Sequence, residues 1–196
     1  IDNLDSKGKV CEVPYDENLD TETWWDLGMN DQTCIWFAQR HKEQIRLIDY
    51  YENAGQGLDH YANILDQKDY KYIRHIAPHD IKVRELGAYG KSRLESALEL
   101  GISFEVAPKL SIEDGIEAVR KALPNCVFDK NNCYQGVESL KAYQKKWDEL
   151  NQCFRNKPKH NYASHSADAF RTGIIGLGAE LSNWKQEIPV NTNYII

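Results

Sequence analysis

The sequence predicts an α/β fold with a mixed central β-sheet that is antiparallel in its first three strands and flanked by helices. Three stretches rich in β-branched and aromatic residues follow one another between residues 22 and 52, with only short turns between them. Such turns join antiparallel neighbours. Beyond residue 57, amphipathic helical stretches alternate with short apolar stretches. This alternation after a meander is typical of a mixed sheet with helices on its faces.

The meander follows a polar and acidic segment, 1–20, which we expect to be a linker or a loosely packed arm. Its first strand, 22–26, contains two adjacent tryptophans and ends in an aspartate. The glycine and asparagine of the next turn tolerate positive φ. The strands 33–37 and 45–51 complete the meander.

The remaining elements are predicted from helical periodicity and from Gly and Pro boundaries. They are a helix at 58–65, a strand at 70–77, a charged loop at 81–91, a helix at 92–100, a strand at 102–106, a helix at 111–123, an extended piece at 126–129, a helix at 135–151, an extended basic segment at 153–161, a helix at 164–181 with a break near Gly176 and Gly178, and a tail at 184–196.

The composition is ordinary for a globular domain and excludes several classes of protein. Of the 196 residues, 41% are hydrophobic and 28% are charged. No apolar run approaches the ~20 residues of a membrane helix, so we expect no membrane association. The first residues do not resemble a secretory signal, and the absence of an initial Met indicates an excised fragment.

The cysteines and the charge add two further limits. The five cysteines include no CxxC pair, which favours a reduced, cytoplasmic protein without structural zinc. The net charge of -6 does not indicate a nucleic-acid binder, but it is an average over unevenly placed basic residues.

Three aspartates lie where a metal site could assemble. Asp26 ends the first strand, Asp80 follows the fourth strand, and Asp168 lies in the first turns of the late helix. Adjacent strand ends hold carboxylates close together, so we expect the fourth strand to lie beside the first in a five-stranded sheet. Hard divalent cations prefer such oxygen ligands, and two ions ~4 Å apart can cleave a phosphodiester. The alternative is that Asp26 only caps its turn.

Other polar residues near these acids have two or more interpretations. Asp31 is either a further ligand or a turn residue. Asp49 is either an outward polar residue or a neighbour of the site, and we expect it to point outward. His165 precedes Asp168 by one helical turn and could orient a water, contact a phosphate or cap the helix. His79 adjoins Asp80, which is weak support for a role in the site.

Basic residues flank the same regions and are candidates for contacts with a phosphate backbone. One group follows Asp80 and another precedes Asp168. For any single residue a solvated loop is the simpler interpretation. The candidates are Lys82, Arg84, Lys91, Arg93, Arg155, Lys157 and Lys159.

Five motifs in this order resemble the C-terminal nuclease domain of tailed-phage large terminases. They are Trp25-Asp26-Leu27-Gly28 with Asp31, Ile48-Asp49-Tyr50-Tyr51-Glu52, Pro78-His79-Asp80, Gly90-Lys91-Ser92-Arg93, and His165-Ser166-Ala167-Asp168-Ala169-Phe170-Arg171. The resemblance runs from about residue 23 to residue 178. It implies an RNase H-like fold for residues 21–196 and cleavage of concatemeric viral DNA during packaging.

The resemblance also implies specific residues and partners. Asp26, Asp80 and Asp168 match the catalytic acids of the family, which use Mg²⁺ or Mn²⁺, and we expect two ions. Expected partners are double-stranded DNA, the packaging ATPase domain of the full-length chain, the portal protein and the small terminase subunit, all in the host cytoplasm. Nothing in this sequence matches the ATPase domain, so segment 1–20 is expected to be a remnant of an interdomain linker.

Two other functions compete with this one. The first is a resolvase- or integrase-type nuclease, which shares the fold and chemistry but not the flanking motifs. The second is a catalytically silent DNA-binding or docking module. Divalent-metal binding and cleavage that depends on the aspartates separate the silent module from both nucleases.

Overall fold

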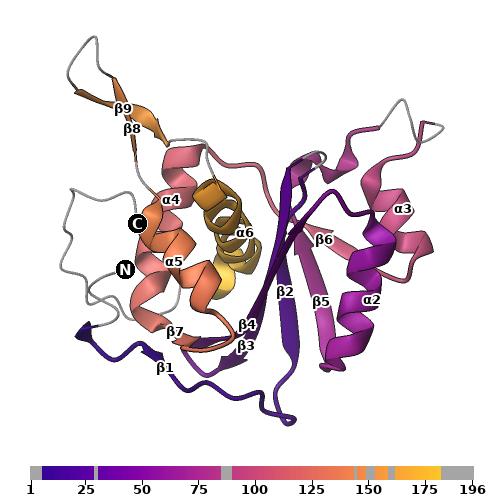
Figure 1. The fold of residues 1–196 in the computed structure, drawn as a ribbon, viewed down its shortest axis with the longest axis horizontal. Coiled ribbons are helices and arrows are strands. Elements are labelled where there is room, and N and C mark those ends of the chain that lie inside the picture. The colour runs from indigo at the N-terminus through magenta and orange to yellow at the C-terminus, as the bar shows by residue number, and fades with distance from the viewer. Residues whose placement is uncertain are drawn as a thin grey trace.

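The computed structural model describes residues 6–28, 31–84, 90–143, 145–148, 153–158 and 162–181. Within these residues, a seven-stranded sheet has the order β1-β7-β4-β3-β2-β5-β6, and β8 pairs with β9 in a separate sheet (Figure 1). The strands are Val10–Cys11 (β1), Thr21–Asp26 (β2), Gln32–His41 (β3), Gln44–Ala54 (β4), Tyr72–Ala77 (β5), Phe104–Val106 (β6), Cys126–Asp129 (β7), Lys145–Asp148 (β8) and Cys153–Pro158 (β9).

Helices cover both faces of the large sheet (Figure 1). The helices α4, α5 and α6 lie on one face, and α2 and α3 lie on the other. The helices are Leu58–Lys68 (α2), Arg93–Glu99 (α3), Ile112–Ala122 (α4), Tyr134–Ala142 (α5) and Tyr162–Leu177 (α6), with short 3₁₀ turns at His79–Lys82 (η1), Leu123–Asn125 (η3) and Gly178–Leu181 (η4).

The predicted pairing of the first four strands is confirmed. Strand β3 runs antiparallel to both β2 and β4, as expected for a meander. Strand β5 lies parallel to β2, with Trp24 opposite Ile76. The carboxyl ends of β2 and β5 therefore meet at one edge of the sheet, which brings the segments after Trp24 and Ile76 to the same side of the molecule.

The two adjacent tryptophans divide the core between the faces of the sheet. Successive strand residues point to opposite faces. Trp24 packs with residues of α6 such as Phe170, whereas Trp25 packs with Tyr61 of α2 and Phe104 of β6. Both indoles are fully buried. Large aromatic side chains thus anchor helices on both faces of one short strand.

Helix α6 approaches the sheet closely because it carries glycine where it crosses β2. A Cβ at Gly173 would lie 1.9 Å from the Trp24 ring. A Cβ at Gly176 would lie 2.6 Å from Ile76 on β5. The helix that we expected to break near Gly176 is therefore continuous as far as Leu177, and the 3₁₀ turn at Gly178 ends it.

The sheet has two more strands than the five that we expected. Strand β7 runs parallel to β4, and β1 runs parallel to β7 at the edge. Part of the segment 1–20, which we expected to be a loose arm, is thus packed on the sheet, and Val13 is buried. Its role as a linker to another domain stays a prediction.

The helix predicted at 135–151 is shorter than expected. Helix α5 ends at Ala142, and Tyr143 has an extended conformation. The backbone then forms the antiparallel pair β8 and β9. The buried face of α5 ends with Leu140, so packing against the sheet no longer favours helix beyond that point.

The expectation that Asp49 points outward is wrong. Its side chain is buried on the α2 face of the sheet, where it forms an ion pair with Lys68 and accepts a hydrogen bond from Tyr70 at 3.1 Å. The buried carboxylate is tolerated because Lys68 neutralises its charge and Tyr70 donates a hydrogen bond to it.

Candidate functional site

The candidate site begins with a contact between the first strand of the meander and the last helix. Asp26 is the last residue of β2 and is half-buried. The Nδ1 atom of His165, in the first turns of α6, lies 2.9 Å from Asp26 Oδ2. The Trp36 indole donates to the carbonyl of Ser166 at 3.0 Å and thereby fixes this end of α6 on the sheet. Asp26 and His165 are thus joined by a rigid packing arrangement.

The carboxylates around His165 change its protonation. The hydrogen bond with Asp26 raises the pKa of His165, and the charges of Asp26, Asp31 and Asp168 add to this effect. Burial of the ring opposes them. His165 therefore has a higher proton affinity than a free imidazole.

Asp168 lies one helical turn after His165 on the same helix and forms an ion pair with Arg171 at 2.9 Å. The charges of nearby acids act on the thiol of Cys34, which lies on β3. Burial raises the pKa of its thiol, and the charges of Glu52, Asp26 and Asp168 raise it further. The structure thus brings Asp26 and Asp168 to one part of the α6 face, above a buried thiol.

Asp80 lies at the same edge of the sheet, but on the far side of β2. It is the second residue of the short 3₁₀ turn η1 that follows β5, and its side chain is exposed, as is that of His79 beside it. Because β5 runs parallel to β2, Asp26 at the end of β2 and Asp80 just after β5 both lie at carboxyl strand ends. The distance between their carboxylates in a cation-bound protein stays a prediction.

These residues have donor atoms that suit a divalent cation, but their side chains are not arranged around one point in this structure. Within the described ranges, no group of three His, Cys, Asp or Glu side chains lies close enough together to hold a metal ion. Asp26 pairs instead with His165, and Asp168 pairs with Arg171. Like charges repel when no cation neutralises them. The oxygen donors themselves are those that Mg²⁺ and Mn²⁺ prefer, so the donor set fits such an ion.

Asp31 follows the turn after β2 and is exposed. Its charge acts on His165, which places it near the acidic group without assigning it as a ligand. The choice between ligand and turn residue stays open.

The predicted DNA-contacting residues other than Arg93 fall into three groups. Lys82 and Arg84 are exposed after β5, beside Asp80. Lys91 forms an exposed ion pair with Glu99 at 2.6 Å. Arg155 and Lys157 are on β9, where the side chains are not described. Lys159 lies outside the described residues.

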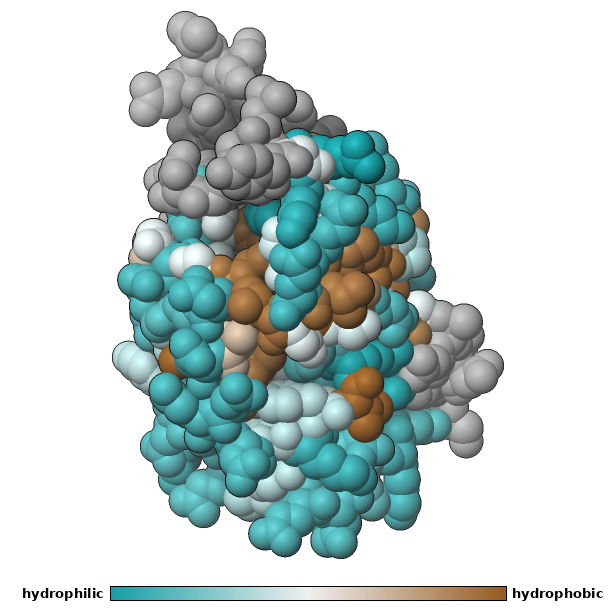
Figure 2. Space-filling view, turned by 90° about the vertical axis from the view of Figure 1, so that its right-hand side faces the viewer, coloured by the Kyte–Doolittle hydropathy of each residue, from teal (hydrophilic) through white to brown (hydrophobic). Residues whose placement is uncertain are grey.

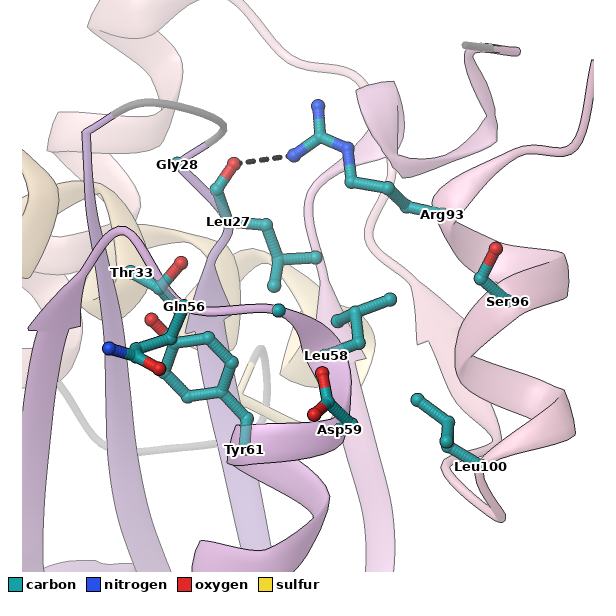
Figure 3. A pocket seen from close by; sticks show the side chains of 11 residues that line it. Leu27, Gly28, Thr33, Gln56, Leu58, Asp59, Tyr61, Arg93, Ser96 and Leu100 are labelled. Carbon is teal, nitrogen blue, oxygen red and sulfur yellow. Dashed lines mark hydrogen bonds between the residues drawn. The ribbon is translucent and has the colours of Figure 1, made fainter. Parts of the chain in front are cut away.

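Arg93 is held differently from an exposed loop cation. It is the first residue of α3, after a capping box between Ser92 and Glu95. Its half-buried guanidinium donates to the carbonyl of Leu27 at 2.6 Å (Figure 3). Arg93 therefore also ties α3 to the turn that follows Asp26.

A pocket of about 380 Å³ opens below this contact, on the α2 face of the sheet. The side chains of Leu27 and Leu58 point toward each other across it, and Leu100 closes its α3 side (Figure 3). Figure 2 shows apolar side chains gathered in the middle of the side that carries α2 and α3. Leu98 on α3 and Leu100 just after it are exposed. The pocket combines leucines with polar side chains such as Asp59 and Arg93.

Glu52 was not predicted as a site residue from the sequence. It lies on β4 opposite Cys34, on the same face as Asp26. The alternation of Tyr50 and Glu52 with Trp24 and Asp26 was a usable signal, but only with the strand register in hand.

Comparison with known proteins identifies the fold. No protein-family model matches the chain. No curated protein matches it either. Among solved structures, the P22 large terminase nuclease domain matches with a TM-score of 0.64 and 18% identity over 85% of this chain and 87% of that one. The fold is that of a large-terminase nuclease domain.

Further terminase structures agree with this assignment. The nuclease domain of the large terminase from bacteriophage SPP1, solved with bound Mn, matches with a TM-score of 0.56 and 17% identity over 78% of this chain and 84% of that one. A large terminase from a thermophilic bacteriophage, solved in complex with ATP-gamma-S, gives 0.65 and 18% identity over 84% of this chain. This chain spans only 41% of that thermophilic terminase. The predicted RNase H-like terminase fold is thus confirmed.

Among the described residues, no helix is both long and apolar enough to cross a membrane.

Proposed function

We propose that the protein is a divalent-metal-dependent endonuclease that cleaves concatemeric viral double-stranded DNA during genome packaging, as the nuclease domain of a large terminase. The observation that carries this proposal is the contact of Asp26, at the end of β2, with His165, one helical turn before Asp168 on α6. The contact joins an acid and a histidine at one edge of a terminase-type fold, and a terminase nuclease of that fold was solved with bound Mn.

In the proposed reaction, residues of the chain would hold the metal ions and would orient the attacking water and the DNA. Asp26 and Asp168 supply carboxylate oxygens from the α6 face, and Asp80 supplies one from the far side of the strand end. Bound Mg²⁺ or Mn²⁺, two ions in our proposal, provides Lewis-acid stabilisation of the phosphodiester in its transition state. His165, held by Asp26, orients a water or contacts a phosphate. The exposed cations Lys82 and Arg84 contact the DNA backbone.

The proposed partners follow from the full-length terminase. They are the ATPase domain of the same chain, the portal protein and the small terminase subunit, in the host cytoplasm. With a net charge of -6, the domain binds DNA weakly by itself, and its affinity falls with salt.

A plasmid-nicking assay in Mn²⁺ or Mg²⁺ tests the proposal. Asp26→Asn, Asp80→Asn and Asp168→Asn each remove a charge that attracts a hard cation, so each lowers cleavage about 10²-fold or more. His165→Ala lowers it less. The matched control is Asp66→Asn, which changes an exposed aspartate on α2 and leaves cleavage unchanged.

Circular dichroism checks the fold of each variant first. Cleavage by Asp26→Asn at the parental rate contradicts the assignment of the site. A parent protein that neither binds Mn²⁺ nor cuts supports the silent DNA-binding or docking module instead.

A further inference from the structure

Arg171 of α6 belongs to the sequence motif around Asp168, but the proposed reaction gives it no role. His165, Asp168 and Arg171 follow one another at spacings of three residues, so they lie along one side of the helix. His165 contacts Asp26, and Arg171 Nη1 lies 2.9 Å from Asp168 Oδ1. Asp168 is therefore placed between a residue that contacts the end of β2 and a cation on its own helix.

The stem of Arg171 is confined by the neighbouring helix α4, which packs against α6 (Figure 1). A Cβ at Gly115 would lie 2.6 Å from Arg171 Cδ and 3.1 Å from Arg171 Cγ. Gly115 is a buried residue of α4, although glycine is less favourable than alanine inside a helix. The stem of Arg171 thus fills the space that a side chain at this position would need.

A buried tyrosine also lies close to the ion pair. Tyr143 ends α5, and its side chain is buried. Burial raises the pKa of its phenol to about 12, the negative charge of Asp168 adds to the rise, and Arg171 opposes it. Both charged groups are therefore near this phenol. Residues from α4, α5 and α6 thus meet around Arg171.

Ion pairs between residues three apart are common on helix surfaces, and most contribute little to stability. Arg120 and Glu117 of α4 form such a pair, with 3.7 Å between Arg120 Nη1 and Glu117 Oε2 and a glutamate side chain that is 50% exposed. The pair of Arg171 and Asp168 is shorter, and its side chains are 20% and 31% exposed. An ion pair that is partly shielded from water and packed against a second helix restricts the orientation of its carboxylate.

We propose that Arg171 is a positioning residue of the proposed nuclease: its guanidinium, held against Gly115 of α4, orients the carboxylate of Asp168. This inference rests on the proposed function, in which Asp168 supplies a carboxylate oxygen to a divalent cation. Arg171 acts through Asp168 and contacts neither the DNA nor the cation. Groups that orient metal ligands in this way typically change metal affinity or activity by about 10–100-fold when they are lost.

Two variants that keep the charge of the site test the inference. Arg171→Lys retains a cation but lacks the planar guanidinium, and Gly115→Ala displaces the arginine stem without changing either member of the pair. Each lowers kcat for plasmid nicking by about tenfold or more and leaves KM for DNA unchanged. Each also weakens Mn²⁺ binding to the complete 196-residue chain by a similar factor in calorimetry. Melting in chelator measures the fold of both.

Two controls isolate the contact. Arg120→Lys makes the same change in the exposed pair of α4 and leaves nicking and Mn²⁺ affinity unchanged. Arg171→Ala removes the stem that Gly115→Ala displaces, so combining the two variants lowers nicking no further than Arg171→Ala alone. A full additional loss in the double variant shows that Gly115→Ala acts by another route and overturns the role of the α4 contact.

The other outcomes separate this inference from the function on which it rests. If Asp168→Asn abolishes nicking but Arg171→Lys and Gly115→Ala keep parental kcat and Mn²⁺ affinity, Arg171 only stabilises α6 and the nuclease site stands without it. Tighter Mn²⁺ binding in both variants shows that Arg171 competes with the cation, which also overturns the inference.

A higher KM and a smaller salt dependence at parental kcat assign Arg171 to DNA binding instead. If the parent protein neither binds Mn²⁺ nor cuts, the metal-dependent function fails together with the inference. Should Arg171→Lys not fold, Gly115→Ala alone decides, because the displaced side chain is flexible and the variant keeps every charge.

Discussion

At one edge of the sheet, the strands β2, β3 and β4 carry different kinds of side chain on the two faces. On the α6 face, Asp26 ends β2 and lies opposite Cys34, which lies opposite Glu52. On the α2 face, their neighbours Leu27 and Thr33 line a pocket with both leucines and polar side chains. The side-chain alternation of a strand is sufficient to place different chemistry on the two faces of a sheet within one residue. Under the proposed function, the acids at this edge of the α6 face serve the reaction, while both faces contribute a packed core.

The largest expected effect shows what the two faces share. Trp24→Ala and Trp25→Ala each remove a fully buried indole, so each lowers the free energy of unfolding by about 3–5 kcal/mol. Urea unfolding followed by circular dichroism measures both. Similar losses confirm that both faces are packed cores. A loss under about 1 kcal/mol for either variant contradicts the packing described for that face.

A smaller effect distinguishes the faces by pH. Burial lowers the pKa of His75, beside Phe104 on the α2 face, to about 4. The unfolded chain then binds a proton that the folded chain does not, so stability is complete above about pH 6.5 and falls as the pH drops toward 4. The loss is about 2 kcal/mol by pH 4, allowing for partial exposure.

His75→Gln removes this titration, so its unfolding free energy depends less on pH between 7 and 4. The exposed His41→Gln is the control and keeps the parental pH profile. Chemical unfolding at several pH values measures both. An unchanged profile in His75→Gln shows that this ring does not titrate differently on folding.

The next effect compares Asp49, which forms an ion pair on the α2 face, with Asp26, which belongs to the proposed metal site. Asp49→Ala on the α2 face leaves Lys68 and Tyr70 without their acceptor and lowers stability by about 1–3 kcal/mol. In the presence of Mn²⁺, the rise in melting temperature is the same as for the parent, because Asp49 is not part of the cation site. For Asp26→Asn we expect the reverse pattern, with a fold at least as stable in chelator and a loss of the Mn²⁺ response. Differential scanning calorimetry with and without Mn²⁺ decides between them.

The smallest effect concerns the exposed ion pair of Lys91 and Glu99. Lys91→Ala changes stability by less than about 0.5 kcal/mol because the pair is solvated. If Lys91 contacts a phosphate, the slope of log affinity against log salt decreases by about one unit. DNA titrations at several salt concentrations measure this slope. An unchanged slope assigns Lys91 to the surface alone.

Local patterns in the sequence predicted the centre of the sheet. The aromatic meander and the strand at 70–77 are long enough to show their periodicity. The place of β5 beside β2 was predicted from the requirement that Asp26 and Asp80 lie close together, and the parallel direction was not predicted. The spacing of His165 and Asp168 is a property of any helix. Strands β1 and β7 have two and four residues, which is too short for a periodic signal.

The remaining features depend on contacts between distant segments. Asp49 was misplaced because its partner Lys68 belongs to another element. Glu52 lies on the same face as Asp26, two strands away, only because of the register of β3 with both of its neighbours. Such pairings come from tertiary packing and turn geometry, and no local window of sequence contains them.

The contact between Asp26 and His165 also determines when the site exists during synthesis. The two residues are 139 positions apart, and His165 lies on the last described α-helix. At about 5–20 residues per second, a ribosome needs roughly 7–28 s to extend the chain from one to the other. Pairing of such distant segments is also slow to fold. A nascent chain therefore carries its first strand long before α6 docks, and under the proposed function it becomes able to cut DNA only at the end of its own folding.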